Sequence, residues 1–210
     1  MSNVGSYEAR LADFDWSIAE RELGWTPGEP INIGWHCSDR ICALGLADKP
    51  ALIWEDFSGR GKRFSYDDVR TLSNTIAAFL QGLGLGPGER ICLFMDRVPE
   101  LYIGFLGILK MGGIAQPLFS AFGDESLHTR LDNAGTAAIL TQRKHVAKVR
   151  KIRDRMPALR HVIVVDAEGG PLRDGETALA MEELPRVERY EVFPSMAETP
   201  SVLHYTSGST

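Results

Sequence analysis

The stretch at residues 90–118, RICLFMDRVPELYIGFLGILKMGGIAQPL, decides the fold class. Its first part, Arg90–Met95, is a short apolar run of the kind that forms a buried strand. Pro99 then opens an apolar helix, since proline is well suited to the first helical position, and Gly112-Gly113 ends it. Ile114–Leu118 is the next predicted strand. A strand, a crossing helix and a second strand form the unit of a parallel sheet.

The same alternation continues beyond residue 118. The expected elements are a helix over Asp124–Asn133, a strand over Ala137–Thr141, a helix over Lys144–Met156 and a strand over His161–Asp166. Strand starts are separated by roughly the length of one βα unit. This pattern indicates the α/β class, with a mostly parallel β-sheet that carries helices on both faces.

Residues 51–89 combine a hairpin with a helix. Ala51–Trp54 and Arg63-Phe64 flank the turn residues Ser58–Gly61, which predicts two short antiparallel strands. A helix is expected to begin at Ser65, because Ser65 and Asp68 have the spacing of a capping box with Asp in place of Glu.

The two ends of the chain are less regular. Helices are expected over Glu8–Arg21 and Ile31–Leu46, which divides the chain into a helical preamble at 1–50 and a partial α/β domain at 51–210. Residues 169–200 are polar and rich in proline, and predict a long excursion with one short helix near Leu179–Leu184. Ser201–Tyr205 is expected to return as a strand.

Composition excludes several classes of protein. The 210 residues carry a formal net charge of −5, which argues against a general nucleic-acid binder, since such a protein needs a basic surface. The most apolar stretch, Leu101–Ile114, is too short for a membrane span, which takes about 20 residues. Three cysteines without metal-ligand spacing favour a reduced cytoplasmic compartment, and we assign no metal site.

The last nine residues, VLHYTSGST at 202–210, carry the chemistry. An apolar strand that delivers Thr206, Ser207, Gly208, Ser209 and Thr210 presents small hydroxyl groups and unobstructed backbone N–H groups together. Such a run can bind an anion, because glycine allows a tight turn while hydroxyls and amides donate to phosphate oxygens. The alternative interpretation is a Ser/Thr-rich loop without a ligand.

Three motifs resemble those of adenylate-forming enzymes. The sequence YTSGST at 205–210 is similar to the first half of their phosphate loop, FSYDDV at 64–69 to their early helix-opening motif, and LKMGGIAQP at 109–117 to their Leu-Lys-x-Gly motif. The three occur in the family's order. Within the family, the chain resembles bacterial acetyl-CoA synthetases, for example in the stretch NIGWHCSDR at 32–40.

The resemblance implies a two-step ligase. A small carboxylic acid and ATP would give an acyl-adenylate and pyrophosphate, and coenzyme A would then displace AMP. Thr206, Ser207, Ser209 and Thr210 would donate to phosphate oxygens, Gly208 would supply the turn, and Mg²⁺ would supply charge. The family's catalytic residues and acyl pocket would lie beyond Thr210, so we expect no catalytic residue in this chain and no activity from it alone.

Contacts with coenzyme A are also implied by the resemblance. Phe119 and Ser120 lie where acetyl-CoA synthetases carry Phe-Gly-Gly-Phe, near the entrance for coenzyme A, and the departure from Gly-Gly suggests a different contact. Arg143 and Arg150 belong to the densest basic stretch of the chain. That stretch is typical of a solvated helix face, and the resemblance adds a contact of either arginine with the 3′-phosphate of coenzyme A.

Two other functions stay open on sequence grounds. The chain could be a non-catalytic nucleotide-binding or interaction module that self-associates through an uncovered sheet edge. It could also belong to a ligase for a medium-chain, aryl or amino acid. No partner among nucleic acids or membranes is expected.

Overall fold

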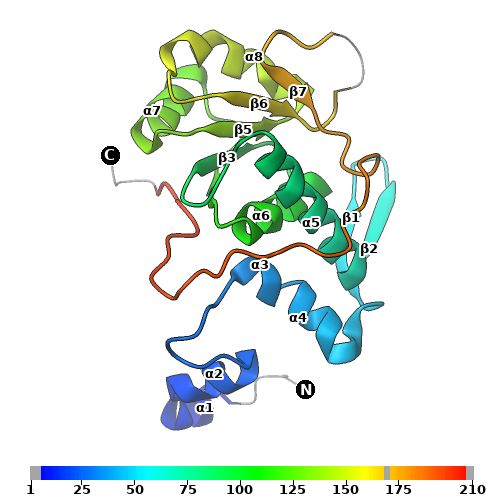
Figure 1. The fold of residues 1–210 in the computed structure, drawn as a ribbon, viewed down its shortest axis with the longest axis vertical. Coiled ribbons are helices and arrows are strands. Elements are labelled where there is room, and N and C mark those ends of the chain that lie inside the picture. Colours follow the sequence, from blue (N-terminus) through cyan, green and yellow to red (C-terminus); the bar gives the residue numbers. More distant parts are fainter. Residues whose placement is uncertain (1–5, 168–170, 207–210) are drawn as a thin grey trace.

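The computed structural model describes residues 6–167 and 171–206, and its centre is a parallel β-sheet (Figure 1). In that part of the chain five strands pair in the order β4-β3-β5-β6-β7, and all of their pairings are parallel. The strands are β3 (Arg90–Phe94), β4 (Ile114–Pro117), β5 (Ala138–Thr141), β6 (His161–Val164) and β7 (Glu176–Ala178).

Helices cover both faces of this sheet, as expected from the sequence (Figure 1). On one face lie α5 (Tyr66–Gly82) and α6 (Pro99–Lys110), and on the other lie α7 (Asp124–Ala134) and α8 (Arg143–Ile152), which a short 3₁₀ turn, Arg153–Arg155, extends. The predicted α/β class is therefore confirmed. The helices predicted to begin at Ser65 and Pro99, and those predicted over Asp124–Asn133 and Lys144–Met156, are present within a few residues of their expected bounds.

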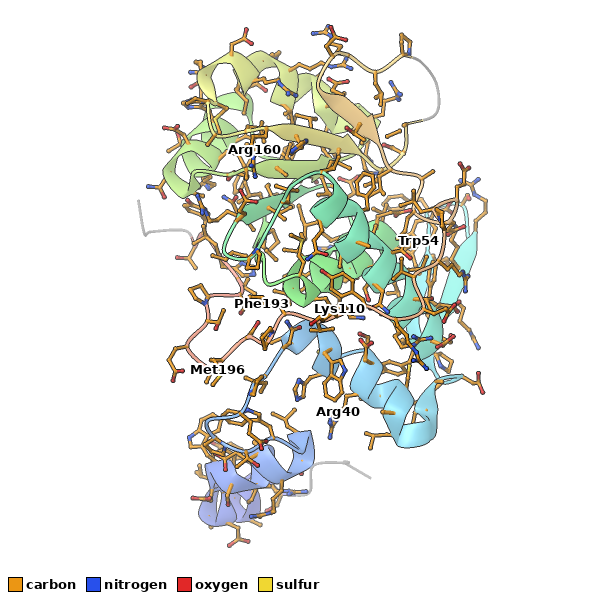
Figure 2. The ribbon with its side chains drawn as sticks, viewed as in Figure 1. Arg40, Trp54, Lys110, Arg160, Phe193 and Met196 are labelled. Carbon is orange, nitrogen blue, oxygen red and sulfur yellow. The ribbon has the colours of Figure 1, made fainter. Side chains whose placement is uncertain are left out.

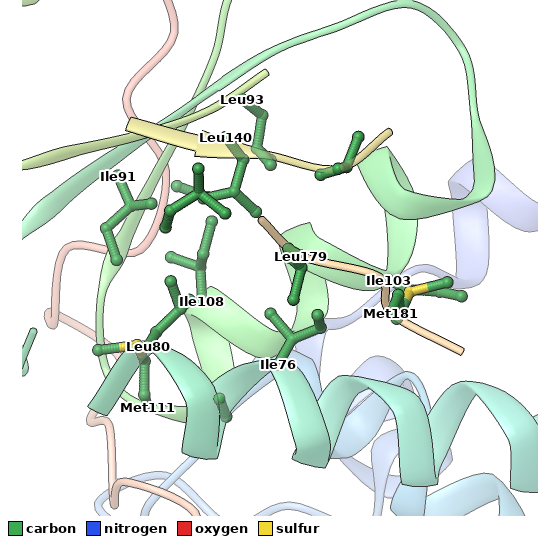
Figure 3. Packing of buried hydrophobic residues seen from close by; sticks show 14 of the residues in the cluster. Ile76, Leu80, Ile91, Leu93, Ile103, Ile108, Met111, Leu140, Leu179 and Met181 are labelled. Atoms are coloured by element: carbon green, nitrogen blue, oxygen red, sulfur yellow. The ribbon is translucent and has the colours of Figure 1, made fainter. Parts of the chain in front are cut away.

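The core beneath α5 and α6 is a continuous apolar cluster (Figure 3). Ile76 and Leu80 of α5 meet Ile103 and Ile108 of α6, and the sheet contributes side chains such as Leu140. All five are buried to at least 99%. The two helices can approach closely because Gly107 presents no side chain: a Cβ there would lie 2.9 Å from Cβ of Ile76.

The hairpin and the start of α5 agree with the sequence prediction. Strands β1 (Pro50–Glu55) and β2 (Gly61–Ser65) pair antiparallel. Ser65 Oγ accepts a hydrogen bond from the Asp68 backbone N–H at 3.1 Å, and the Asp68 carboxylate accepts one from the Ser65 N–H at 3.0 Å. This reciprocal capping box satisfies two backbone donors at the helix start.

The preamble is more broken than expected. The predicted helix Glu8–Arg21 is two helices, α1 (Tyr7–Asp13) and α2 (Trp16–Leu23), because Asp15 is extended and caps α2 through Ser17. The predicted helix Ile31–Leu46 is also wrong as one helix; it consists of α3 (Ile33–His36), α4 (Asp39–Ile41) and a π-helical segment, Cys42–Leu46. Helices α1 and α2 have no buried residue and lie away from the sheet (Figure 1). The division at residue 50 stays a prediction.

A polar contact fastens α3 and α4 to α6 (Figure 2). The fully buried Lys110 ammonium pairs with the Asp39 carboxylate at 2.6 Å and donates to Asn74 Oδ1 at 2.7 Å. Nearby, Asn32 Nδ2 donates to the carbonyl oxygens of Leu109 at 2.8 Å and Phe193 at 3.1 Å. The preamble and the segment around Phe193 therefore meet at the end of α6.

The segment after β6 departs from the prediction. Glu176–Ala178 forms β7, which the sequence analysis missed, and pairs with β6. Residues 179–184 are an extended stretch and a turn, so the helix predicted there is wrong. Of the expected strand at 201–205, the structure shows one parallel bridge, between Val202 and Ala115 at the β4 edge of the sheet. Self-association through a sheet edge stays a prediction.

Candidate functional site

The predicted phosphate segment, residues 206–210, follows a short backbone pairing of residues 201–203 with Ala115 of β4. The Ala115 N–H donates to the Ser201 carbonyl and the Leu203 N–H donates to the Ala115 carbonyl, both at 2.9 Å. Because this short pairing is parallel, the chain runs on from residue 203 past the carboxyl end of the sheet. In open α/β sheets, ligands bind at that end of the strands.

Thr206 is the only predicted phosphate-binding residue within the described part of the chain, and neither it nor residues 202–205 are helical. Ser207, Gly208, Ser209 and Thr210 lie outside the described residues. The hydroxyl contacts assigned to this segment therefore stay a prediction. The structure gives the position of residues 203–206, which we call the root of the segment.

Tyr205 is fixed to α7 within that root. Its phenol oxygen lies 2.7 Å from Asn133 Oδ1 and 3.0 Å from the Arg130 carbonyl oxygen. Its ring packs beside the apolar cluster under α7 and α8. Burial raises the pKa of the Tyr205 phenol, so the group stays protonated and can donate at neutral pH.

The turn that contains Phe119 and Ser120 follows β4 directly and also lies at the carboxyl end of the sheet. Phe119 is 66% exposed. Ser120 Oγ donates to Asp96 Oδ1 at 2.7 Å, and Lys148 Nζ donates to the Ser120 carbonyl at 2.9 Å. The turn is therefore held from β3 through Asp96 and from α8 through Lys148.

Asp96 is a functional-site candidate that the sequence analysis missed. Its carboxylate receives the Lys144 ammonium, the Ser120 hydroxyl and, at 2.9 Å, His145 Nε2. The hydrogen bond from Lys144 is the largest cause that holds the pKa of Asp96 well below its usual range, so the group stays ionised. The only signal in the sequence is an aspartate directly after a buried strand. That signal does not reveal which side chains Asp96 contacts.

Arg143 and Arg150 lie on α8, seven residues apart and hence on one side of the helix. Arg143 donates to the Ala167 carbonyl, and Arg150 forms a two-point pair with Glu176 of β7 at 2.7 and 2.8 Å. These contacts run toward β6 and β7. The contacts of Ser120 run instead to Asp96 and Lys148, so the structure does not gather the four residues assigned to coenzyme A into one cluster of direct contacts.

The Arg150–Glu176 pair gives a pH prediction. Arg150 is the largest cause that lowers the pKa of Glu176 from 4.5 to about 2, and the Glu176 side chain is only 3% exposed. A carboxyl whose pKa is lower in the folded state stabilises the fold above its unfolded pKa and loses that effect as the pH falls. We expect Glu176→Gln to reduce the free energy of unfolding by about 2 kcal/mol at pH 7.

Urea unfolding of the wild type and of Glu176→Gln between pH 7 and pH 2.5 checks this prediction. The difference between the two proteins should be constant above about pH 5 and shrink as the pH approaches 2. The control is Glu125→Gln, which breaks the exposed pair with Arg155 and should cost less than about 1 kcal/mol. A difference for Glu176→Gln that does not vary with pH would contradict the assignment.

A shallow groove of about 280 Å³ is lined by apolar side chains such as Trp25, Leu109 and Met196. Its wall also contains Gly112 and Gly113, which precede β4. The groove therefore lies at the amino end of that strand, whereas the predicted phosphate segment starts from the carboxyl end. We do not assign it to the nucleotide.

The described residues contain neither a metal-binding cluster nor a membrane-spanning helix. In residues 6–167 and 171–206, no three His, Cys, Asp or Glu side chains come together in a group that could hold a metal ion. Across the same ranges, every helix is too short or too polar to cross a membrane.

Comparison with known proteins assigns this chain to a family. The chain belongs to the family of AMP-binding enzymes, which matches residues 42–210. Among characterised proteins it is similar to the acetyl-coenzyme A synthetase of Bacillus subtilis (strain 168), at 31% identity over 99% of this chain and 36% of the relative. The acetyl-coenzyme A synthetase of Deinococcus radiodurans is 28% identical over 93% of this chain and 32% of its own length.

Solved structures show the same fold. A Brucella canis acyl-CoA synthetase superposes with a TM-score of 0.85 at 24% identity, over 97% of this chain and 36% of that one. An anthranilate CoA ligase in complex with anthranoyl-AMP gives a TM-score of 0.74 at 23% identity, over 86% of this chain and 33% of that one. The chain thus spans about a third of the length of these relatives.

Proposed function

We propose that this chain supplies the N-terminal part of an AMP-forming ligase that converts acetate or another short-chain carboxylic acid, ATP and coenzyme A into an acyl-CoA, AMP and pyrophosphate. The observation that carries the proposal is the position of Tyr205 and Thr206. They follow a backbone pairing with β4 and lead away from the carboxyl end of a parallel sheet, in a chain of the AMP-binding family. The acetyl-coenzyme A synthetase relatives support the choice of a short acyl group.

The proposed chemistry has two steps. A carboxylate oxygen attacks the α-phosphorus of ATP, the bond to the bridging oxygen of pyrophosphate breaks, and an acyl-adenylate forms. The sulfur of coenzyme A then attacks the acyl carbon, its proton leaves, and the bond to AMP breaks. In the first step a highly charged leaving group must be held in line, so the protein contributes mainly position and hydrogen-bond donors.

The phosphate segment would supply those donors. Thr206, Ser207, Ser209 and Thr210 would donate hydroxyl hydrogen bonds to the β- and γ-phosphates, and Gly208 would supply the turn. Residues 202–210 contain no lysine or arginine, so Mg²⁺ is part of the proposal as a source of positive charge. In residues 6–167 and 171–206 no three His, Cys, Asp or Glu side chains come together, and we assign no metal ligand and no step through this ion.

Coenzyme A would approach the turn at Phe119 and Ser120, with Arg143 or Arg150 near its phosphate. The pair with Glu176 occupies Nε and Nη2 of Arg150, whereas a guanidinium has five N–H donors. Donors therefore remain for a phosphate, but Glu176 neutralises part of the charge. In keeping with these small-molecule substrates and the family, we also propose a cytoplasmic location.

The test is acid-dependent exchange of labelled pyrophosphate into ATP. We expect the product of the whole gene to catalyse exchange with acetate and Mg²⁺ well above the rate without acid. The 210-residue chain alone should give only background, because in the proposal the groups that hold adenine and the acyl chain lie beyond it. No exchange by the whole gene product with any small carboxylic acid would overturn the proposal, and turnover by the 210-residue chain would overturn its second half.

A further inference from the structure

The guanidinium of Arg130 lies between two aromatic rings from separate segments of the candidate site. It is 4.4 Å from the ring centroid of Phe122, in the turn after β4, and 5.7 Å from that of Tyr205, before the phosphate segment. Both distances are within the range of a cation–π interaction. Arg130 is itself steadied on α7, because its Nη1 donates to the Ser126 carbonyl at 2.9 Å.

The backbone carbonyl of Arg130 also contacts Tyr205, through the phenol hydroxyl. The Tyr205 hydroxyl has one proton, which it can donate to Asn133 Oδ1, at 2.7 Å, or share with the Arg130 carbonyl, at 3.0 Å. The same carbonyl accepts from Gln116 Nε2 at 3.2 Å, and Gln116 is fully buried. Gln116 Oε1 in turn accepts from Thr136 Oγ1 at 2.6 Å. The support beneath Tyr205 is therefore part of a buried, hydrogen-bonded network.

We infer that Arg130 is a positioning residue for the triphosphate of ATP, and that it acts by fixing Tyr205 and hence the root of the phosphate segment. The inference rests on the proposed function. Within the described residues up to 206, Leu203 makes the last backbone hydrogen bond from this segment to β4. Beyond it, the Tyr205 side chain attaches the chain to α7, and Thr206 follows directly.

The same contact links the two substrate segments. Phe122 belongs to the turn assigned to coenzyme A, and Tyr205 leads into the segment assigned to ATP. A displacement of either ring changes the surroundings of the Arg130 guanidinium. Arg130 therefore couples the position of one segment to that of the other, and it places a positive charge beside a segment that has none of its own.

The first arm of the test needs no ligand. Hydrogen–deuterium exchange of the amides at 203–206 is compared in the 210-residue wild type and in Arg130→Ala, Arg130→Lys and Tyr205→Phe. We expect Arg130→Ala to raise the exchange rate of the Leu203 amide about tenfold, Arg130→Lys to restore most of the protection, and Tyr205→Phe to lie between them. Amides of β3 and β5 should keep their wild-type rates. The matched control is Arg155→Ala, which removes an arginine from an exposed pair and should leave residues 203–206 unchanged.

The second arm uses acid-dependent pyrophosphate exchange by the whole gene product. Arg130→Ala should raise the KM for ATP about tenfold and change kcat less than threefold, and Arg130→Lys should recover most of the affinity. A simple loss of folded protein would lower the apparent kcat and leave the KM unchanged, so the split separates positioning from stability.

Each result decides a different claim. Wild-type exchange at 203–206 in Arg130→Ala would overturn the anchoring role. Altered exchange with an unchanged KM for ATP would overturn the nucleotide role. If the wild-type gene product shows no acid-dependent exchange, the proposed function fails and the nucleotide role fails with it, while the ligand-free arm still decides whether Arg130 anchors the segment.

Discussion

Asp39→Ala is expected to lower the free energy of unfolding by about 3 kcal/mol, because it leaves the buried Lys110 ammonium without its counter-charge. The Lys110 side chain is completely buried and lies 2.6 Å from the Asp39 carboxylate. Burial already lowers the pKa of Lys110, and Asp39 opposes that shift. We expect a loss of unfolding free energy at the lower end of the range for a broken buried ion pair, because Asp39 itself is 19% exposed.

Urea unfolding of the wild type and of three variants measures this effect. The double variant Asp39→Ala, Lys110→Met should be more stable than Asp39→Ala alone by at least about 1 kcal/mol, because it removes the unpaired charge together with its partner. The control is Glu182→Ala, which breaks the exposed Lys62–Glu182 pair and should change stability by less than about 1 kcal/mol. A double variant less stable than Asp39→Ala would contradict the explanation, since Lys110 would then stabilise the fold without Asp39.

Gly107→Val is expected to cost about 3 kcal/mol, because α5 and α6 have no space for a side chain at that position. Even an alanine Cβ would lie 2.9 Å from Cβ and Cγ2 of Ile76 and from the Ser73 carbonyl oxygen. The neighbouring atoms belong to a β-branched side chain and to helical backbone, neither of which can move freely. The two helices must therefore separate and expose part of the cluster shown in Figure 3.

Gly104→Ala is the matched control on the same helix. A Cβ at Gly104 would meet side-chain atoms of Leu93 and Leu140 at 3.4 Å, which is ordinary contact. That substitution should be neutral or stabilise by up to about 1 kcal/mol, since alanine is the better helix former. Thermal and urea unfolding of both variants give the comparison, and equal stability of the two would show that the close approach of α5 and α6 is not the cause.

The sequence predicted the body of the fold because its signals there are local. The run Arg90–Met95 is apolar on both faces, as a strand covered from both sides must be, and Pro99 and Gly112 mark the ends of α6. Pairing order is different. The order depends on which strands pair across the sheet, and it cannot be predicted from any single segment of the chain.

Two wrong predictions, the missed strand β7 and the helix at 179–184, also arise because contacts distant in sequence determine the structure. β7 contains three residues, Glu-Thr-Ala, without apolar alternation, and it exists because its backbone pairs with β6 and because Glu176 binds Arg150. The second wrong prediction is the short helix expected near Leu179–Leu184. Leu179 and Met181 are both buried in the core while the chain between them is not helical, so tertiary contacts determine the conformation there.

The candidate site was predictable only where one segment carries the whole signal. The run from Thr206 onward could be recognised because its hydroxyls and glycine are adjacent in sequence. Arg130 and Asp96 could not, because Arg130 contacts Tyr205, 75 positions away, and Asp96 contacts Ser120, 24 positions away. Their roles exist only when the turn after β4, the helix α7 and the returning segment have come together.

The order of strands in the sheet has one further consequence. From β3 the chain passes to β4 on one side and then crosses back to β5 on the other, so the direction of winding reverses around β3. The connecting helices α6 and α7 consequently lie on opposite faces, and in open α/β sheets it is at such a reversal that ligands bind. Asp96 follows β3 directly and so stands at that reversal, and both helices begin from the same edge of the sheet, α6 after β3 and α7 after β4.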